Sequence, residues 1–349
     1  MNDKKTVFVG LSGGVDSSVA AARLLARGYN VVGVFIKVWH PDFMICNWEQ
    51  ERLDAMRVAA HLEIPFLTCD AEAEYRDQVA TEFINEYKAG RTPNPDVLCN
   101  QNVKFGAFLR FAKQHGADFI ATGHYAQKLE NKLVRGLDKN KDQTYFLWTL
   151  TEEQLDYTLF PVGDTTKENI RLEADKYGVP TASKKDSQGI CFLGHVDIPE
   201  FLSHYVELKE GNVLNENKQV IGAHKGALVY TNGQRHGFTL NTDDDKREPM
   251  YVISRDLEHN TITVSNQKPL TKQDNHITLE NVITRSPLVT GEIIQAQFRY
   301  RQDPFLIEVI RVSEKSITLR PTAPTELPAG GQSCVLYRDN VCVGGGIIS

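Results

Sequence analysis

The chain passes from an apolar run, Val7-Phe8-Val9, into Ser12-Gly13-Gly14-Val15-Asp16-Ser17-Ser18 and then into an alanine-rich segment, residues 19–25. The apolar run predicts a buried strand, and the alanine-rich segment predicts a helix. A strand, a Gly-Ser turn and a helix N-terminus form an anion site, because the glycines admit a phosphate to the backbone and free amides point at it. Asp16 is a carboxylate in that turn. A carboxylate beside phosphates needs a cation, so we expect Mg²⁺.

The composition is that of an ordinary globular protein, with 41% hydrophobic and 24% charged residues among 349. This length predicts two or three domains. No apolar run is long enough to span a membrane, and the first residues lead directly into the first predicted strand. We therefore expect no targeting segment, no membrane contact and a cytoplasmic protein. The six cysteines are too few for a disulfide scaffold, and neither they nor the ten histidines show metal-ligand spacing.

The net charge of −6 is unevenly distributed, because residues 88–141 carry ten Lys or Arg against four Asp or Glu. A basic stretch on an acidic protein suits a localised contact with RNA. A solvated surface explains the same charges equally well.

Strand and helix patterns alternate over the first two hundred residues. We predict strands at 31–36, 64–67 and 118–124, and helices at 49–63, 73–87 and 104–115, the last closed by Gly116. This alternation predicts an α/β domain with a doubly wound parallel sheet, in which ligands bind beyond the carboxyl ends of the strands. Residues 12–18 and 122–124 both lie at such ends.

Helical periodicity disappears after about residue 205. Short alternating runs separated by Gly, Asn and Asp predict strands at 251–254, 261–264, 293–300, 305–312, 316–320, 333–337 and 341–346. This pattern predicts a small mixed or β central domain and a C-terminal β-barrel. The expected domains are residues 1–204, 205–265 and 266–349.

A second segment contains side chains that could take part in a reaction. It reads Gly90-Arg91-Thr92-Pro93-Asn94-Pro95-Asp96-Val97-Leu98-Cys99-Asn100. Its two prolines predict a rigid loop rather than a helix. We expect Cys99 where this loop becomes a helix, because a helix N-terminus favours the thiolate. Asp96 is a candidate general acid or base. Simple burial of Cys99 is the alternative, and the rigid loop favours the reactive role.

A third segment reads Ser183-Lys184-Lys185-Asp186-Ser187-Gln188-Gly189-Ile190-Cys191-Phe192-Leu193-Gly194, and its two lysines favour a Cys191 thiolate. Two reactive cysteines can pass sulfur through a persulfide and end as a disulfide. The sequence leaves open whether Cys99 and Cys191 meet. We expect Cys69 and Cys342 to be buried in strands, and Cys46, in a loop near the predicted anion site, not to react.

The three segments together resemble the tRNA-specific 2-thiouridylase family, a branch of the enzymes whose pyrophosphatase loop splits ATP into AMP and pyrophosphate. The resemblance extends over essentially the whole chain. It implies that ATP, with Mg²⁺, activates the C2 oxygen of the wobble uridine, position 34, in tRNAs for Lys, Glu and Gln, and that sulfur replaces this oxygen. It also implies a sulfur donor protein, either a cysteine desulfurase or a persulfide relay protein. We expect a monomer.

The resemblance assigns roles to single residues. The catalytic residues would be the nucleophile Cys99, the persulfide carrier Cys191, and Asp96. ATP would contact Gly10, Leu11, Ser12, Gly13, Gly14, Val15, Asp16, Ser17, Ser18, Ile36 and Gly123, where the family commonly has Met in place of Ile36. The target base would face Asn94, Pro95 and Asp96. Other contacts with tRNA would come from His124, Lys141, Asp142, Gln143, Arg299, Tyr300 and Gln332. For Arg299-Tyr300, a solvated strand face is the plain alternative.

Two other functions stay open on the residues alone. One is another adenylating synthetase or amidotransferase of the same superfamily, which would not need the two cysteines. The other is a non-catalytic RNA-binding module that holds ATP as a structural ligand. It would release neither AMP nor pyrophosphate.

Overall fold

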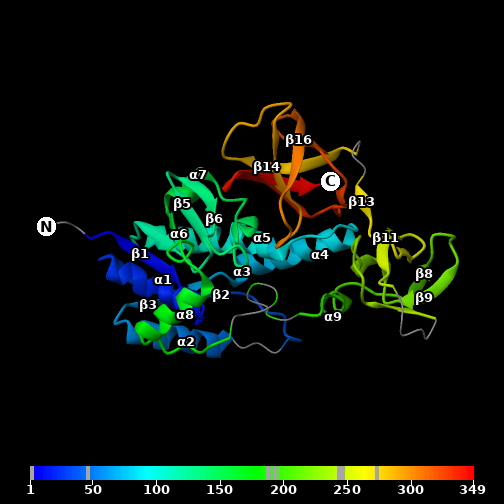
Figure 1. Cartoon of the computed structure of the whole chain (residues 1–349). Coiled ribbons are helices and arrows are strands. Elements are labelled where there is room, and N and C mark those ends of the chain that lie inside the picture. The colour runs from blue at the N-terminus through cyan, green and yellow to red at the C-terminus, as the bar shows by residue number, and fades with distance from the viewer. Residues whose placement is uncertain are drawn as a thin grey trace.

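The computed structural model describes residues 4–44, 48–185, 189, 191, 194, 196–241, 248–271 and 275–349. Cys46 lies outside these residues, as do Asp186, Ser187, Gln188, Ile190, Phe192 and Leu193 of the third segment. Figure 1 shows an α/β part in blue to green, a barrel in orange and red beside it, and a smaller sheet in green and yellow. Within the described ranges, no helix combines the length and the apolar composition needed to cross a bilayer.

The N-terminal part is built on a parallel sheet with the strand order β3-β2-β1-β4-β7. Its strands are β1 (Thr6–Gly10), β2 (Asn30–Lys37), β3 (Phe66–Asp70), β4 (Phe119–Ala121) and β7 (Thr158–Leu159). Val7 and Val9 of β1 pack in the core with α1 (Val15–Ala26), α2 (Trp48–His61) and α8 (Lys167–Lys176). Phe8 packs on the opposite face, because successive side chains of a strand alternate. Helices therefore cover both faces, and the predicted doubly wound sheet is confirmed.

Two long helices cover the Phe8 face, and each contains a π-helical stretch. The first consists of α3 (Glu72–Tyr75), the π-helical η1 (Arg76–Ala80) and α4 (Thr81–Lys88); the second consists of α5 (Pro95–Cys99), the π-helical η2 (Asn100–Ala107) and α6 (Phe108–Gln114). The segments of each helix follow one another without a gap.

The second helix begins nine residues earlier than the predicted start at 104, so the prediction of a loop as far as Asn100 is wrong. Proline is favoured at the first helical position, because no N–H is needed there. Asn94 caps the helix, with its Oδ1 accepting the N–H groups of Asp96 and Val97 at 3.0 and 3.2 Å. Pro95 therefore starts this helix instead of preventing it.

A second sheet, with the order β10-β9-β8-β12-β11, forms the central part. Its elements are α9 (Ile198–Ser203), β8 (Gly211–Leu214), β9 (Val220–His224), the 3₁₀ turn η4 (Ala227–Val229), β10 (Phe238–Leu240), β11 (Tyr251–Asp256) and β12 (Thr261–Ser265). Its core includes Phe83 and Tyr87 of α4, packed with Phe201 and Tyr230. The far end of the first long helix thus belongs to the core of the central part.

Six strands close the C-terminal β-barrel, because β14 pairs with both β17 and β20. They are β14 (Ile277–Thr284), β15 (Ile293–Gln297), β16 (Phe305–Val312), β17 (Ser316–Pro321), β19 (Ser333–Arg338) and β20 (Val341–Ile348). The short strands β13 (Leu270–Thr271) and β18 (Thr325–Glu326) pair with each other and form a separate two-stranded sheet. The predicted barrel is confirmed.

A hairpin of the N-terminal part extends the barrel sheet. Its strands, β5 (Ala126–Leu129) and β6 (Lys132–Arg135), were not expected from the sequence, and Val134 of β6 pairs with Val341 of β20. The chain then continues through η3 (Thr144–Phe146) and α7 (Glu152–Asp156) to β7. This pairing ties the barrel to the parallel-sheet part through backbone hydrogen bonds.

Candidate active site

The loop after β1 leaves its backbone open at a helix N-terminus. Gly13 has a φ of +69°, and an added Cβ would lie 2.7 Å from the carbonyl oxygen of Glu51. At Gly14, which caps α1, an added Cβ would meet only Ser12 Oγ, at 3.3 Å, among the atoms of the described chain. A phosphate can therefore approach the backbone at Gly14, where helix amides point outward. The loop can therefore receive a phosphate group at the start of α1.

The serines of this loop differ in what their hydroxyls do. Ser18 Oγ donates to Gly14 O at 2.7 Å and lies 3.1 Å from Thr181 Oγ1, and its side chain is fully buried. Ser17 Oγ also bonds Gly14 O, at 3.2 Å. Ser12 is exposed. Ser17 and Ser18 therefore hold the shape of the loop, whereas Ser12 presents a hydroxyl to a ligand.

Asp16 has two partners that lie far away in the sequence. Lys167 Nζ at the start of α8 lies 2.6 Å from Asp16 Oδ1, and Tyr125 donates its hydroxyl to the same oxygen at 2.7 Å. Asp16 is thus paired with an ammonium group, and the Mg²⁺ expected beside it stays a prediction. No motif marks Lys167, and only the packing of α8 on α1 brings it to the loop.

The other residues predicted to contact ATP gather at the carboxyl ends of neighbouring strands. Gly123, after β4, lies against the start of α1, where an added Cβ would be 2.7 Å from Ser17 N. Ile36 of β2 is buried, and its Cδ1 lies 3.7 Å from the position of a Cβ on Gly10. Leu11 and Val15 are buried in the core. The nucleotide contacts themselves stay predictions.

The two cysteines that the sequence singled out lie together. Cys99 Sγ is 3.5 Å from Cys191 Sγ, and both are free thiols. Asp96 Oδ1 accepts the N–H of Cys191 at 2.8 Å, and Tyr75 donates its hydroxyl to the carbonyl oxygen of Cys191 at 3.1 Å. The backbone of Cys191 is thus held by Asp96 in the first turn of α5 and by Tyr75. At this separation a disulfide needs only a small closing movement.

The two thiols have opposite pKa shifts. Burial raises the pKa of Cys99 well above its ordinary value, and Cys99 is fully buried at the last residue of α5 rather than at a helix N-terminus. The expectation that a helix N-terminus favours a Cys99 thiolate is therefore wrong. The hydrogen bond from Cys99 and the charge of Lys104 lower the pKa of Cys191 against the effect of burial. Cys191 is the thiol that ionises first.

Lys104 supplies the positive charge that we had expected from Lys184 and Lys185. Lys184 Nζ instead pairs with Asp54 Oδ2 at 2.8 Å. Lys104 Nζ lies 3.4 Å from His124 Nε2, and Thr122 Oγ1 lies 2.8 Å from His124 Nδ1. Burial, followed by the charge of Lys104, lowers the pKa of His124 well below its ordinary value, so this ring is neutral. Lys104 was not predicted from the sequence, because it lies beyond the segment from Gly90 to Asn100 that contains Asp96 and Cys99.

Asp96 keeps acid–base capacity in this environment. Burial raises its pKa, whereas the hydrogen bond from Cys191 N and the charge of Lys104 oppose that rise. A carboxyl group whose pKa is raised holds a proton more readily than a free one, which suits it to acid–base catalysis.

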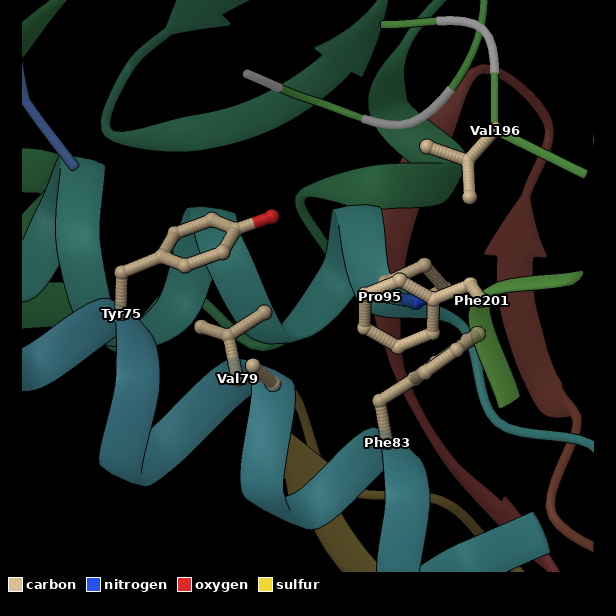
Figure 2. A pocket seen from close by; sticks show the side chains of 7 residues that line it. Tyr75, Val79, Phe83, Pro95, Val196 and Phe201 are labelled. Atoms are coloured by element: carbon tan, nitrogen blue, oxygen red, sulfur yellow. The ribbon is translucent and has the colours of Figure 1, made fainter. Parts of the chain in front are cut away.

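An apolar pocket borders the thiol site. Figure 2 shows its lining side chains, which come from the first long helix, the start of α5 and the segment around α9: Tyr75, Val79, Ala80, Phe83, Pro95, Val196 and Phe201. Pro95 belongs to the segment predicted to face the target base, and Tyr75 also holds the backbone of Cys191.

The segment that leads into α5 lies where the three parts of the chain meet. Thr92 N donates to Gly330 O at 2.8 Å, and Thr92 Oγ1 lies 3.0 Å from Thr231 Oγ1. Arg255 of the central sheet donates to Gly90 O. The barrel and the central sheet thus both fix the approach to Asn94 and Cys99.

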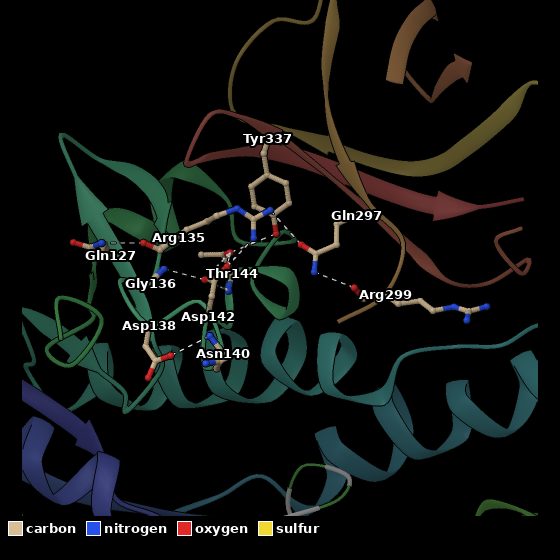
Figure 3. Close-up of polar contacts among 10 residues, drawn as sticks. All are labelled: Gln127, Arg135, Gly136, Asp138, Asn140, Asp142, Thr144, Gln297, Arg299 and Tyr337. Carbon is tan, nitrogen blue, oxygen red and sulfur yellow. Dashed lines mark hydrogen bonds and ion pairs between the residues drawn. The ribbon is translucent and has the colours of Figure 1, made fainter. Parts of the chain in front are cut away.

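Asp142, predicted to contact tRNA, lies inside a polar network instead of on the surface. Its side chain is 8% exposed and accepts from Arg135 Nη1 at 2.8 Å, from Gly136 N at 2.9 Å and from Thr144 Oγ1 at 2.9 Å (Figure 3). The Arg135 guanidinium lies 3.6 Å from the centre of the Tyr337 ring. Asp142 therefore positions the loop that carries Lys141 and Gln143. His124, which was also predicted to contact tRNA, is buried as well.

The remaining residues predicted to contact tRNA lie in turns of the barrel. Arg299 and Tyr300 follow the end of β15 at Gln297, so their placement in a strand is wrong. Arg299 Nη2 donates to Asn232 O at 2.9 Å, and the Tyr300 ring centre lies 4.5 Å from that of Phe146. Gln332 accepts the N–H of Ala329 at 2.9 Å. All three are partly exposed, and their contacts with tRNA stay predictions.

The described residues contain no group of three or more His, Cys, Asp or Glu side chains that could hold a metal ion. The other described cysteines, Cys69, Cys334 and Cys342, are buried in β3, β19 and β20, as predicted for Cys69 and Cys342.

Three family models match the chain in succession. They are described as "tRNA methyl transferase HUP domain" over residues 5–195, "tRNA methyl transferase PRC-barrel domain" over 199–266 and "Aminomethyltransferase beta-barrel domain" over 278–348. Curated relatives named tRNA-specific 2-thiouridylase MnmA match almost end to end. The one from Proteus mirabilis (strain HI4320) is 41% identical over 99% of this chain and 98% of its own. The one from Bacillus pumilus (strain SAFR-032) is 42% identical over 98% and 94%.

Solved structures show a more distant likeness. A 4-thiouridine synthetase in complex with RNA and ATP is 21% identical, with a TM-score of 0.37, over 58% of this chain and 50% of that chain. The U34-tRNA thiolase NcsA from Methanococcus maripaludis is 16% identical, with a TM-score of 0.36, over 58% and 64%.

Proposed function

We propose that this chain, which belongs to the tRNA-specific 2-thiouridylase family, replaces the C2 oxygen of the wobble uridine of tRNA with sulfur at the expense of ATP. The observation that carries the proposal is the 3.5 Å separation of Cys99 Sγ and Cys191 Sγ. The matching family models are named after methyl transfer, whereas the curated relatives that match the chain almost end to end are named 2-thiouridylases. Sulfur delivery through a persulfide uses both thiols.

The first half of the reaction belongs to the loop after β1. ATP supplies an adenylyl group that makes the C2 oxygen a good leaving group. We assign the phosphates to the open backbone at Gly14 and to the hydroxyl of Ser12, with Gly123 leaving room beside the start of α1. Mg²⁺ would enter with the phosphates, and Asp16 would be its protein ligand in exchange for the Lys167 ammonium.

The second half belongs to the two thiols. In the proposed sequence, the terminal sulfur of a Cys191 persulfide forms a bond to C2, and AMP leaves. Cys99 then gives its proton to Asp96 and attacks Cys191 Sγ. A Cys99–Cys191 disulfide forms, and the bond between Cys191 and the transferred sulfur breaks. The electron pair of that bond stays on the sulfur as 2-thiouridine forms. A cellular thiol then reduces the disulfide.

The finer expectations belong to this proposal as well. We propose the tRNAs for Lys, Glu and Gln as substrates, with position 34 as the target. A cysteine desulfurase or a persulfide relay protein would load Cys191. Because tRNA and ATP are cytoplasmic, so is the proposed reaction, and we propose that a monomer carries it out. Asn94, Pro95 and Asp96 would face a base withdrawn from the anticodon stack, which costs a few kcal/mol.

The test is reconstitution with unmodified tRNA for Lys, ATP, Mg²⁺, cysteine and a cysteine desulfurase. We expect AMP, pyrophosphate and 2-thiouridine at position 34, measured by chromatography and mass spectrometry of digested tRNA. Cys99→Ala and Cys191→Ala should abolish 2-thiouridine, whereas the matched control Cys69→Ala in β3 should retain it. AMP release that is indifferent to both active-site substitutions would instead indicate another adenylating synthetase. No AMP with any tRNA would indicate an RNA-binding module.

A second test uses tRNA from cells that lack the gene. Position 34 should carry uridine without sulfur, and the intact gene should restore 2-thiouridine. Unchanged 2-thiouridine in the absence of a paralogue would refute the proposal.

A further inference from the structure

The π-helical stretch η2 changes which side chains share a face with Cys99. In an α-helix, residues five positions apart are turned about 140° from each other. In a π-helix the backbone bonds run between residues five positions apart, so the angle between such residues is much smaller. Cys99 directly precedes η2 (Asn100–Ala107), and Lys104 is its fifth successor. The π-helical winding therefore turns Lys104 toward the sulfur of Cys99.

The surroundings of Lys104 leave its charge directed at the two sulfurs. Burial would lower the pKa of Lys104, but its interactions with Cys191, Cys99 and Asp96 raise that pKa instead. On the opposite side, His124 Nε2 lies 3.4 Å away. This ring is neutral and anchored by Thr122, so it does not add a competing positive charge. Among the described residues, Tyr75 also faces the pair; burial raises its pKa well above its ordinary value, so it stays a neutral phenol.

We propose that Lys104 is a catalytic residue of the sulfur transfer, in which its ammonium keeps the sulfur of Cys191 anionic and the π-helical turn delivers that ammonium. This inference rests on the proposed function. The Cys191 thiolate attacks the outer sulfur of a donor persulfide, one S–S bond forms as another breaks, and the donor leaves as a thiolate. The terminal sulfur of the Cys191 persulfide then carries the negative charge that attacks C2.

Lys104 also gives the two thiols different protonation states and therefore different roles. The hydrogen bond that Cys99 donates holds its proton, while Cys191 faces the ammonium. Cys191 therefore accepts sulfur, and Cys99 stays a thiol until the transferred sulfur must be released. An ionised Cys99 would instead attack Cys191 Sγ of the persulfide too early, forming the disulfide and expelling the outer sulfur as sulfide before it reaches C2.

The experiment measures the pH dependence of alkylation at Cys191 by iodoacetamide, followed by mass spectrometry of the peptide that contains it. In Lys104→Gln the midpoint should rise by about one to three pH units, because an opposite charge shifts a pKa by that amount. Lys104→Arg should keep the original midpoint. Lys184→Gln is the matched control, because Lys184 precedes Cys191 in the sequence but pairs with Asp54, and its midpoint should not move.

The same variants are then loaded by a cysteine desulfurase and cysteine, and the persulfide on Cys191 is counted by mass. Lys104→Gln should load at least tenfold more slowly at pH 7, and loading should recover at higher pH. Lys104→Met serves as the uncharged variant if the Gln variant does not fold.

An unchanged Cys191 midpoint in Lys104→Gln or Lys104→Met would overturn the inference, and so would a shift of equal size in Lys184→Gln. The alkylation readout needs neither tRNA nor turnover. A wild-type chain that makes 2-thiouridine while its Lys104 variants titrate normally refutes this inference alone. A wild-type chain that makes no 2-thiouridine refutes the proposed function, whatever the titration shows.

Discussion

Arg135 Nη2 donates a hydrogen bond to Gln297 Oε1 at 3.2 Å and so joins the β5–β6 hairpin to the barrel. The same guanidinium pairs with Asp142, and Gln297 Nε2 donates to Arg299 O at 2.9 Å (Figure 3). The loop of Lys141 and Gln143 and the turn of Arg299 are therefore held by one polar network. If both contact tRNA, the network sets their spacing before tRNA arrives.

Arg135→Met should destabilise the protein and weaken tRNA binding. It leaves the Asp142 carboxylate buried without its ion-pair partner, which costs about 3–5 kcal/mol of unfolding free energy. Urea denaturation and a tRNA binding assay at fixed salt measure the two effects. Arg110→Gln breaks a more exposed pair with Glu74 and should cost about 0–1 kcal/mol. Equal stability of the two variants would show that the network is not a structural clamp.

Gly123→Ala should stop the ATP half-reaction and leave the thiols intact. The new Cβ would lie 2.7 Å from Ser17 N, so the start of α1 has to move. We expect pyrophosphate release with tRNA to fall at least tenfold, while alkylation of Cys191 is unchanged. Gly116→Ala is the control, because an added Cβ there meets nothing within 4 Å and its cost is only backbone strain of about 1 kcal/mol. A normal rate in Gly123→Ala would place the nucleotide elsewhere.

Lys167→Gln should raise the KM for ATP. The variant loses the ammonium that lies 2.6 Å from Asp16, and with it the positive charge that Lys167 would offer the phosphates once Mg²⁺ takes its place at Asp16. A charge-assisted hydrogen bond contributes about 1.5–3 kcal/mol, which corresponds to at least a tenfold change in KM. Steady-state kinetics over a range of Mg²⁺ concentrations measures it. Lys176→Gln at the exposed end of α8 should leave the KM unchanged; if it has the same effect, general charge rather than the Asp16 pair is responsible.

His124 should make stability depend on pH in the acid range. Burial lowers its pKa in the folded protein well below the ordinary value of 6.5. Below pH 6.5 the unfolded chain therefore binds a proton that the folded chain resists, and the unfolding free energy falls as the pH falls, by up to about 1.4 kcal/mol per unit. His124→Gln should reduce this slope in urea titrations between pH 6.5 and 5, leaving the contribution of His224, whose pKa burial also lowers. The exposed His115→Gln should keep it. An unchanged slope in His124→Gln would mean that other groups cause it.

The fold was largely predictable because its signals are local. Val7-Phe8-Val9 followed by Ser12–Ser18 predicts a strand and a phosphate-type turn, and the alternation of patterns predicts the doubly wound sheet. The β5–β6 hairpin was missed because its strands are short, and because what stabilises it is the distant β20. The start of α5 was missed because Pro95 counts against a helix everywhere except at its first position.

The site was predictable where one segment carries it and unpredictable where distant segments meet. Cys99, Asp96 and Cys191 stood out by their contexts, and the structure brings them together. Lys104 and Lys167 did not, because an isolated lysine has no signature and its partner is fixed only by packing. The buried state of Asp142 was likewise hidden, since its role depends on Arg135 and on the barrel residue Gln297.

The pairing of β6 with β20 has a consequence for synthesis. As the chain leaves the ribosome, the hairpin emerges long before β20, the strand that pairs with its edge. An unpaired strand edge is a template for pairing with other chains, so nascent or truncated forms that lack β20 should be prone to aggregation. Lys132, which lies on that edge strand, carries the kind of charge that discourages such pairing until β20 arrives.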